Sequence, residues 1–274
     1  MRKAILLSII CAVCAPAESN FRAPLVAVAR DDVKQLRLVY GVTGNFILSD
    51  VIAKDVLSWA FSGAGGLVQT RTALLLVHPN GRITRSIKAP QGRPTLIAPG
   101  TASLPALYFS SANSQLRQVR AETDQEVALE PEALAGNLVA LHAVSQNRAE
   151  LAVCRAGDLW LLTVKLGSGS VEHEVALGGA ARAAACGTTR TAAVLLMNGS
   201  VIVASAKELI IQHAGGMERR IELNRGGRSD HAYQIRQVGD GWIEVDSEKE
   251  SPLLVRVAGA GEAIYRLPNA ELKQ

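Results

Sequence analysis

The sequence predicts an all-β fold made of repeated four-stranded antiparallel units. The clearest unit lies near the C-terminus, where four short apolar runs, at 231–238, 242–245, 253–257 and 263–267, follow one another at even spacing. Each run is rich in Val, Ile, Tyr or Trp, and turns that contain Gly, Asp or Ser separate the runs, which is the pattern of an antiparallel meander. The same rhythm recurs along the chain, with no long helical periodicity after the first 17 residues.

Three units of the same kind occupy residues 56–176. Their expected strands lie at 56–61, 67–70, 73–77 and 82–88; at 95–98, 106–110, 116–120 and 126–129; and at 138–144, 149–154, 159–164 and 171–176. In the first of these units Asn80-Gly81 marks a hairpin turn, because both residues tolerate the positive φ that a tight turn demands. Repetition at roughly 35 to 45 residues favours many small sheets over a two-sheet sandwich, which needs far fewer strands.

A further unit is expected at 180–186, 192–197, 201–205 and 209–213, followed by one more strand at 219–223. The run 180–186 is mostly alanine, which is depleted in sheets. We expect this run to be an innermost strand, because small side chains fit where strands crowd together near an axis.

Three strands are expected before the first complete unit, at 25–30, 35–40 and 46–48. Strands that stand alone at the N-terminus can complete the sheet formed by the last strands of the chain, and so remove an open edge. We therefore expect the beginning of this chain to pair with its last unit and close a ring of sheets.

In the number and spacing of its strands the chain resembles divergent bacterial secreted β-propellers. About 23 strands at four per blade imply a single propeller of about six blades, with five or seven left open. The resemblance covers nearly all of the chain after the leader, but it lies in rhythm alone: the repeated Gly-His and Trp-Asp pairs of WD40 chains, the kelch double glycine and the Asp box are missing. Trp59, Trp160 and Trp242 fall in three different units, which predicts packing between sheets.

The first 17 residues have the pattern of a secretory signal peptide. Arg2 and Lys3 precede an apolar stretch at 4–13, and Ala15-Pro16-Ala17 provides a cleavage site. This stretch is too short to span a membrane. A lipoprotein signal with Cys14 as the lipidated residue is the alternative. We expect a signal peptide at 1–17 and one propeller domain at 18–274, exported to the periplasm or the cell exterior.

Charge and hydropathy exclude some partners. The chain has 29 basic and 25 acidic residues, and removal of the leader takes away two of the basic ones. A nearly neutral mature chain argues against nucleic acid as its partner, since nucleic-acid binding usually needs a clustered basic face. No later segment offers about 18 consecutive apolar residues, so no transmembrane segment is expected.

Two cysteines, Cys154 and Cys186, remain after the leader is removed. In an oxidising compartment such a pair is a candidate disulfide, and here it would join consecutive units. Two buried free thiols that behave as small hydrophobic residues are the alternative, which the sequence leaves open.

No catalytic or metal-binding motif is found in the sequence. The five histidines show no metal-ligand spacing, no G-x-S-x-G occurs, and a strand rather than a helix follows the glycine-rich segment 61–66. We expect no catalytic residue, no metal and no cofactor. The acidic residues Glu244, Asp246, Glu248 and Glu250 alternate along an expected strand, and we interpret them as a solvated outer face.

The best candidate for recognition is the glycine-rich loop before the last unit. It carries Arg225, Arg228, Asp230 and His231. Loops at the rim of a rigid β scaffold often bind ligands, and two arginines can hold a carboxylate or a phosphate. We therefore predict that these four residues bind a ligand or a partner.

The function expected from the sequence is that of an exported, non-catalytic scaffold that binds another protein or a small ligand at a propeller face. The alternative is a propeller enzyme, a hydrolase or a lyase, with its site at the central channel. His142 and His231 both lie on expected first strands and could point into that channel. A purely structural module in a larger envelope assembly is a third reading.

Overall fold

The computed structural model describes most of the chain after the leader. The described residues are 24–31, 35–42, 45–89, 95–131, 135–186, 193–197, 199–205, 207–213, 216–223, 233–247, 250–257 and 263–266. The expected signal peptide at 1–17 lies outside them. The described residues form 23 strands and one helix, α2 (Gly179–Ala185), and none of their helices is long and apolar enough to cross a membrane.

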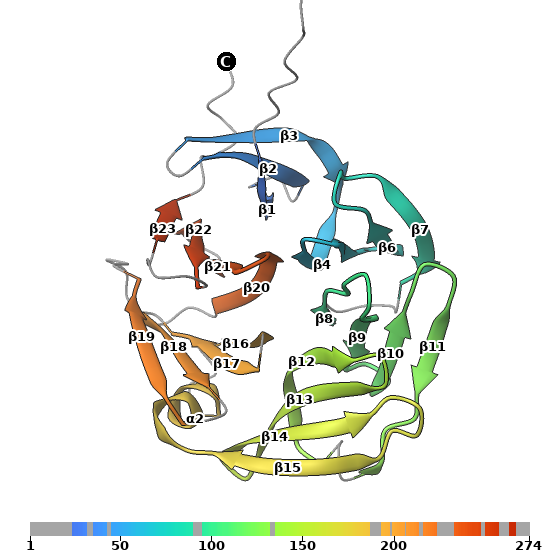
Figure 1. The fold of residues 1–274 in the computed structure, drawn as a ribbon, viewed down its shortest axis with the longest axis vertical. Helices are drawn as coiled ribbons and strands as arrows, with labels where there is room; N and C mark the ends of the chain where they lie inside the picture. The colour runs from blue at the N-terminus through green and yellow to red at the C-terminus, as the bar shows by residue number, and fades with distance from the viewer. Residues whose placement is uncertain are drawn as a thin grey trace, which may run out of the picture.

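The strands form antiparallel meanders arranged around a common axis, as in a β-propeller (Figure 1). The first sheet has three strands, β1 (Leu25–Arg30), β2 (Leu36–Val42) and β3 (Asn45–Ala53). Three further sheets contain β8 (Leu96–Ala98), β9 (Ala106–Ser110), β10 (Gln115–Val119) and β11 (Asp124–Val127); β12 (Asn137–Ser145), β13 (Arg148–Arg155), β14 (Asp158–Lys165) and β15 (Val171–Leu177); and β16 (Ala193–Met197), β17 (Ser200–Ala204), β18 (Glu208–His213) and β19 (Glu218–Glu222).

The last sheet has eight strands because two meanders meet edge to edge. One meander contains β4 (Val56–Ser62), β5 (Gly65–Thr70), β6 (Ala73–Val77) and β7 (Ile83–Lys88), and the other contains β20 (Tyr233–Gly239), β21 (Trp242–Ser247), β22 (Glu250–Arg256) and β23 (Ala263–Arg266). A single parallel pair, Val238 with Phe61, joins β20 to β4. The Gly63 amide also donates to Asp240 Oδ1 at 2.8 Å. The ring of sheets therefore closes between the first complete meander and the last.

The N-terminal sheet lies outside this joint. The strands β4, β8, β12, β16 and β20 contact one another in turn around the axis, whereas β1 packs against β20, β21 and β4 from farther out (Figure 1). Among the described strands, β1, β2 and β3 pair only with one another. The expected pairing of the N-terminal strands with the last unit is therefore wrong, because β20 and β4 meet directly in front of β1.

Side chains between neighbouring sheets form the core. Leu141, Leu151 and Leu162 are cross-strand neighbours on β12, β13 and β14, and all three are buried against the sheet β8–β11. Burial of such a side chain stabilises the fold by about 1.5–3 kcal/mol. Trp59 is fully buried, and Trp160 and Trp242 pack against two of these core clusters. The expected packing role of the tryptophans is confirmed.

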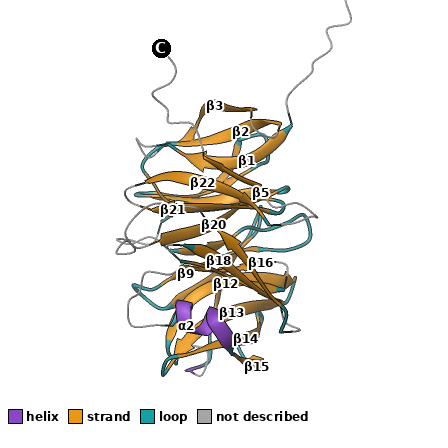
Figure 2. Cartoon of the chain, turned by 90° about the vertical axis from the view of Figure 1, so that its left-hand side faces the viewer, coloured by secondary structure: helices purple, strands orange, loops and turns teal. Residues whose placement is uncertain are grey.

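Residues 180–186 do not form the strand expected from the sequence. Residues 180–185 lie in α2, Cys186 is its C-cap, and the helix packs against β14, β17 and β18 (Figure 2). Alanine has the highest helix propensity of all residues, and these residues are not hydrogen-bonded into any described sheet that would override it. The first strand of this sheet is β16, and its fourth strand is β19, the additional strand of the sequence pattern.

Candidate functional site

A group of four charged side chains and one tryptophan, buried except for the partly exposed Arg30, lies where β1, β4, β20 and β21 meet. The guanidinium of Arg236 lies 3.8 Å from the centroid of the Trp59 ring and donates to Glu244 Oε1 at 3.1 Å. The same nitrogen is 3.7 Å from Asp246 Oδ2. Arg30 donates to that Asp246 oxygen at 2.9 Å, and its guanidinium lies 5.0 Å from the Trp59 centroid. We call these five residues the charged joint.

Burial dominates the electrostatics of the charged joint. The side chain of Glu244 is inaccessible to solvent and that of Arg236 is 8% exposed. Loss of hydration raises the pKa of Glu244 to about 7, although the Arg236 charge opposes the shift. Burial likewise lowers the pKa of Arg236. Glu244 Oε2 and Trp59 Nε1 are buried without a hydrogen-bond partner among the described residues.

The charged joint links the N-terminal strand β1 to β20 and β21 near the C-terminus. When Glu244 is ionised, the two carboxylates balance the two cations. The ion pair between Arg30 and Asp246, which are 216 positions apart in the sequence, connects β1 with β21. Glu244 and Asp246 share one face of their strand, as the sequence pattern predicts. The prediction that this face is solvated is wrong, because both side chains are buried. Their strand β21 is the second in its sheet, and the N-terminal sheet covers the face that carries them.

The loop residues predicted to bind a ligand, Arg225, Arg228, Asp230 and His231, lie outside the described residues. Their binding role stays a prediction. The strand that follows them, β20, starts at Tyr233 and carries Arg236 of the charged joint.

Two described histidines have neighbours that matter for chemistry. His142 lies on the inner strand β12, directly opposite Glu150 on β13. Burial lowers the pKa of His142 and raises the pKa of Glu150. The His142 Nδ1 atom is buried and has no hydrogen-bond partner among the described residues. This pair lies near the axis and is the described feature most like an acid–base site.

Ser200 and His213 form a second pair that the sequence did not reveal. They are cross-strand partners on β17 and β18, and Ser200 Oγ lies 2.7 Å from His213 Nδ1. In a serine nucleophile site the hydroxyl bonds Nε2, while Nδ1 is oriented by a carboxylate. Here the hydroxyl occupies Nδ1 itself, so the pair is a structural cross-strand contact. The sequence predicts this contact only if the register between β17 and β18 is already known.

Apolar side chains are exposed at one end of the N-terminal sheet. Leu25, Tyr40 and Ile47 are cross-strand neighbours on β1, β2 and β3, and Val42 follows on the same face. Val42 is 62% exposed, Ile47 is 56% exposed and Leu25 is 39% exposed. We call these four residues the N-terminal apolar surface. A contiguous apolar group in a solvent-exposed position is typical of an interaction site.

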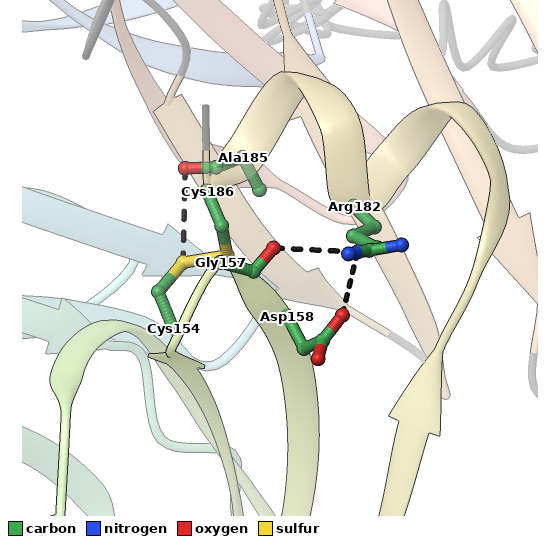
Figure 3. The surroundings of a disulfide bond; sticks show 6 residues. All are labelled: Cys154, Gly157, Asp158, Arg182, Ala185 and Cys186. Carbon is green, nitrogen blue, oxygen red and sulfur yellow. Dashed lines mark hydrogen bonds and ion pairs between the residues drawn. A yellow bond between two sulfur atoms is a disulfide. The ribbon is translucent and has the colours of Figure 1, made fainter. Parts of the chain in front are cut away.

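A disulfide bond joins Cys154 and Cys186 (Figure 3). It fixes the end of α2 to β13, and their Cα atoms are 5.6 Å apart. Beside it, the Arg182 Nε of α2 donates to the Gly157 carbonyl oxygen at 3.3 Å and pairs with Asp158 Oδ1 at 2.6 Å. Of the two alternatives that the sequence left open for these cysteines, the disulfide is confirmed.

Within the described part of the chain, no three His, Cys, Asp or Glu side chains are grouped closely enough to hold a metal ion.

Comparison with known proteins shows similarity in fold alone. No protein-family model and no curated protein matches the sequence. A chain in the crystal structure of a nidogen/laminin complex superposes with a TM-score of 0.54 at 8% identity, over 88% of this chain and 92% of that one. A streptogramin B lyase gives 0.48 at 10% identity, over 90% and 84%. The C-terminal WD40 domain of Sif2 gives 0.43 at 13% identity, over 88% and 69%. The chain is a divergent β-propeller.

Proposed function

We propose that this β-propeller is an exported, non-catalytic scaffold that binds another protein through the N-terminal apolar surface. The exposure of Val42 and Ile47 beside Leu25 carries the proposal. Apolar side chains at the centre of a protein interface are desolvated on binding and supply much of its free energy. A chain of similar fold was crystallised in a nidogen/laminin complex, which is compatible with a protein partner.

Export is supported by the disulfide between Cys154 and Cys186, because such bonds persist in oxidising compartments. A cleaved signal peptide at 1–17 would deliver the domain 18–274 to the periplasm or the cell exterior. The described residues form five four-stranded meanders, two of which share the eight-stranded sheet. We propose that the three-stranded N-terminal sheet is an incomplete sixth blade.

A propeller enzyme is the second candidate, and the His142–Glu150 pair favours it. The pair lies on the two innermost strands of its sheet, and burial shifts both pKa values away from their ordinary values. A hydrolase or lyase that used this pair would lose activity in His142→Gln while its stability stayed near that of the wild type. A scaffold would keep all partner binding in the same variant.

A photo-crosslinking amino acid at position 47 tests the scaffold proposal in the native envelope. The matched control carries the same amino acid at Val175, which is 42% exposed on β15, on another sheet. We expect one discrete crosslinked protein from position 47 and none from position 175, and Val42→Asp should abolish it. Equal crosslinking from both positions, or no crosslink from position 47, would contradict the proposal.

A further inference from the structure

Charge is distributed unevenly along this chain. No Asp or Glu occurs from residue 56 to residue 121. The same stretch holds seven basic residues, Arg71, Arg82, Arg85, Lys88, Arg93, Arg117 and Arg120. The chain as a whole has 29 basic and 25 acidic residues, so the rest of the chain contains 22 basic and 25 acidic residues. The sector from β4 to β10 therefore carries basic but no acidic side chains. Acidic residues follow at once, with Glu122 after β10 and with Asp124 and Glu126 on β11 of the same sheet.

Apart from Arg117, the described basic side chains of this sector differ in their partners from those elsewhere in the described chain. Ion pairs between arginines and described carboxylates involve Arg30, Arg37, Arg117, Arg148, Arg155, Arg182, Arg220 and Arg236. Of the other basic residues in the sector, Arg85 donates to the Arg120 carbonyl oxygen at 3.0 Å and Arg120 to that of Gln146 at 3.3 Å. Neither they nor Arg71, Arg82 and Lys88 contact a described carboxylate.

These side chains follow the outermost strand of their sheet. Arg82 directly precedes β7, and Arg85 and Lys88 lie within it, at intervals of three residues (Figure 1). That spacing is about 10 Å per interval and about 20 Å in all along an extended strand. Side chains three positions apart on a strand point to opposite faces, so Arg85 and Lys88 lie on the two sides of β7. Lys88 is opposite Ala73, which places Arg71 at the same end, and Arg120 adjoins Arg85. We call these five residues the basic edge.

The chemistry of the basic edge suits one class of ligand. Arg71, Arg82 and Lys88 are exposed, so their charges are free to neutralise a polyanion and release its counterions. No aromatic residue lies on β7 for the stacking of nucleic-acid bases. Ile83 is the only large exposed apolar side chain among the described residues of the basic stretch, which is too little for the apolar core of a protein interface.

We propose that the basic edge binds a linear anionic polysaccharide, with its carboxylate or sulfate groups held along β7. Because β7 is the outermost strand of its sheet, cations on both of its faces can hold a ligand that runs along the strand and repeats its charge. This site is separate from the N-terminal apolar surface. Binding at the basic edge gives the exported protein a second attachment, to an acidic glycan of the envelope or its surroundings.

Titration of the full mature protein with alginate, a linear polyuronate, tests the proposal. The variant Arg71→Glu, Arg82→Glu and Lys88→Glu removes the outer charges of the basic edge. Its matched control, Lys54→Glu, Lys165→Glu and Lys207→Glu, makes the same charge change at three exposed lysines outside the basic stretch. The variant Arg82→Gln and Lys88→Gln serves if the triple reversal fails to fold.

We expect wild type and the control to bind alginate at about 50 mM salt, and the basic-edge variant to bind at least about tenfold more weakly. The slope of log affinity against log salt should fall by about one for each basic residue removed from the basic edge. No binding by wild type, or equal losses in both triple variants, would overturn the proposal. Tighter binding of polyglutamate or duplex DNA than of alginate would overturn the choice of ligand class.

Discussion

The guanidinium of Arg236 lies 3.8 Å from the ring centroid of Trp59, and so spans the joint at which the propeller closes. Arg236 belongs to β20 and Trp59 to β4, the two strands that share the single parallel pair. A cation over the face of a tryptophan is attracted by the ring, and the attraction grows when both groups are shielded from water. The closure thus depends on a few side chains more than on a ladder of backbone hydrogen bonds.

Removal of one partner from the charged joint should be costly. Arg236→Met leaves Glu244 buried without its cation, and we expect the free energy of unfolding to fall by about 3–5 kcal/mol. Arg236→Met with Glu244→Leu should recover most of this loss, because no uncompensated charge remains. Urea denaturation measures both. The control is Arg220→Met, which removes an exposed ion pair and should change stability by less than about 1 kcal/mol. If Arg220→Met cost as much stability as Arg236→Met, burial would not be the cause of the loss at the charged joint.

The raised pKa of Glu244 predicts that acid stabilises this joint. The folded state holds the Glu244 proton up to about pH 7, whereas the ordinary value is 4.5. Between these values the folded protein binds more protons, so stability falls as pH rises, by about 3 kcal/mol in all. The lowered pKa of His142 acts in the opposite direction below its ordinary value of 6.5. The test therefore compares the free energy of unfolding of wild type with that of Glu244→Gln from pH 4 to pH 8. A difference that stays constant over this range would contradict the raised pKa of Glu244.

The disulfide should contribute a measurable part of the stability. Cys154 and Cys186 are separated by 32 positions, and a loop of that length predicts a loss of about 3–4 kcal/mol when the bond is absent. Cys154→Ala with Cys186→Ala should lower the denaturation midpoint of the wild type. Reductant should lower the wild type to the level of the variant and leave the variant itself unaffected. If the variant were as stable as oxidised wild type, the disulfide would make no contribution to stability.

Gly239 is required by the close approach of β1. A Cβ atom at this position would lie 2.6 Å from the Val26 carbonyl oxygen. Gly239→Ala should therefore push β1 away from β20 and destabilise the protein by about 1–3 kcal/mol. Gly167→Ala is the matched control, since nothing lies within 4 Å of a Cβ there. Hydrogen exchange of the β1 amides should rise in Gly239→Ala alone.

The strand pattern was largely predictable because alternation and turn residues are local properties. The structure confirms the strands at 25–30 and 106–110 to the residue, and it places a hairpin turn at Asn80-Gly81, where the Gly81 amide donates to the His78 carbonyl oxygen at 2.9 Å. The helix α2 was missed because the expectation of a regular fourth unit outweighed the helix propensity of alanine.

The closure and the charged joint could not be read from the sequence. Arg30 and Asp246 are 216 positions apart, and only the packing of β1 over the β20–β4 joint brings them together. Acidic residues that alternate on a strand also look the same whether water or another sheet covers them. The predicted loop residues Arg225 and Arg228 remain a hypothesis for mutagenesis.

The direct meeting of β20 and β4 has a mechanical consequence. Tension applied at the N-terminus would peel β1, β2 and β3 away one after another, and the pull would then stop at β4, where the remaining strands still encircle the axis. The three-stranded N-terminal sheet would therefore unfold under load before the ring of sheets does.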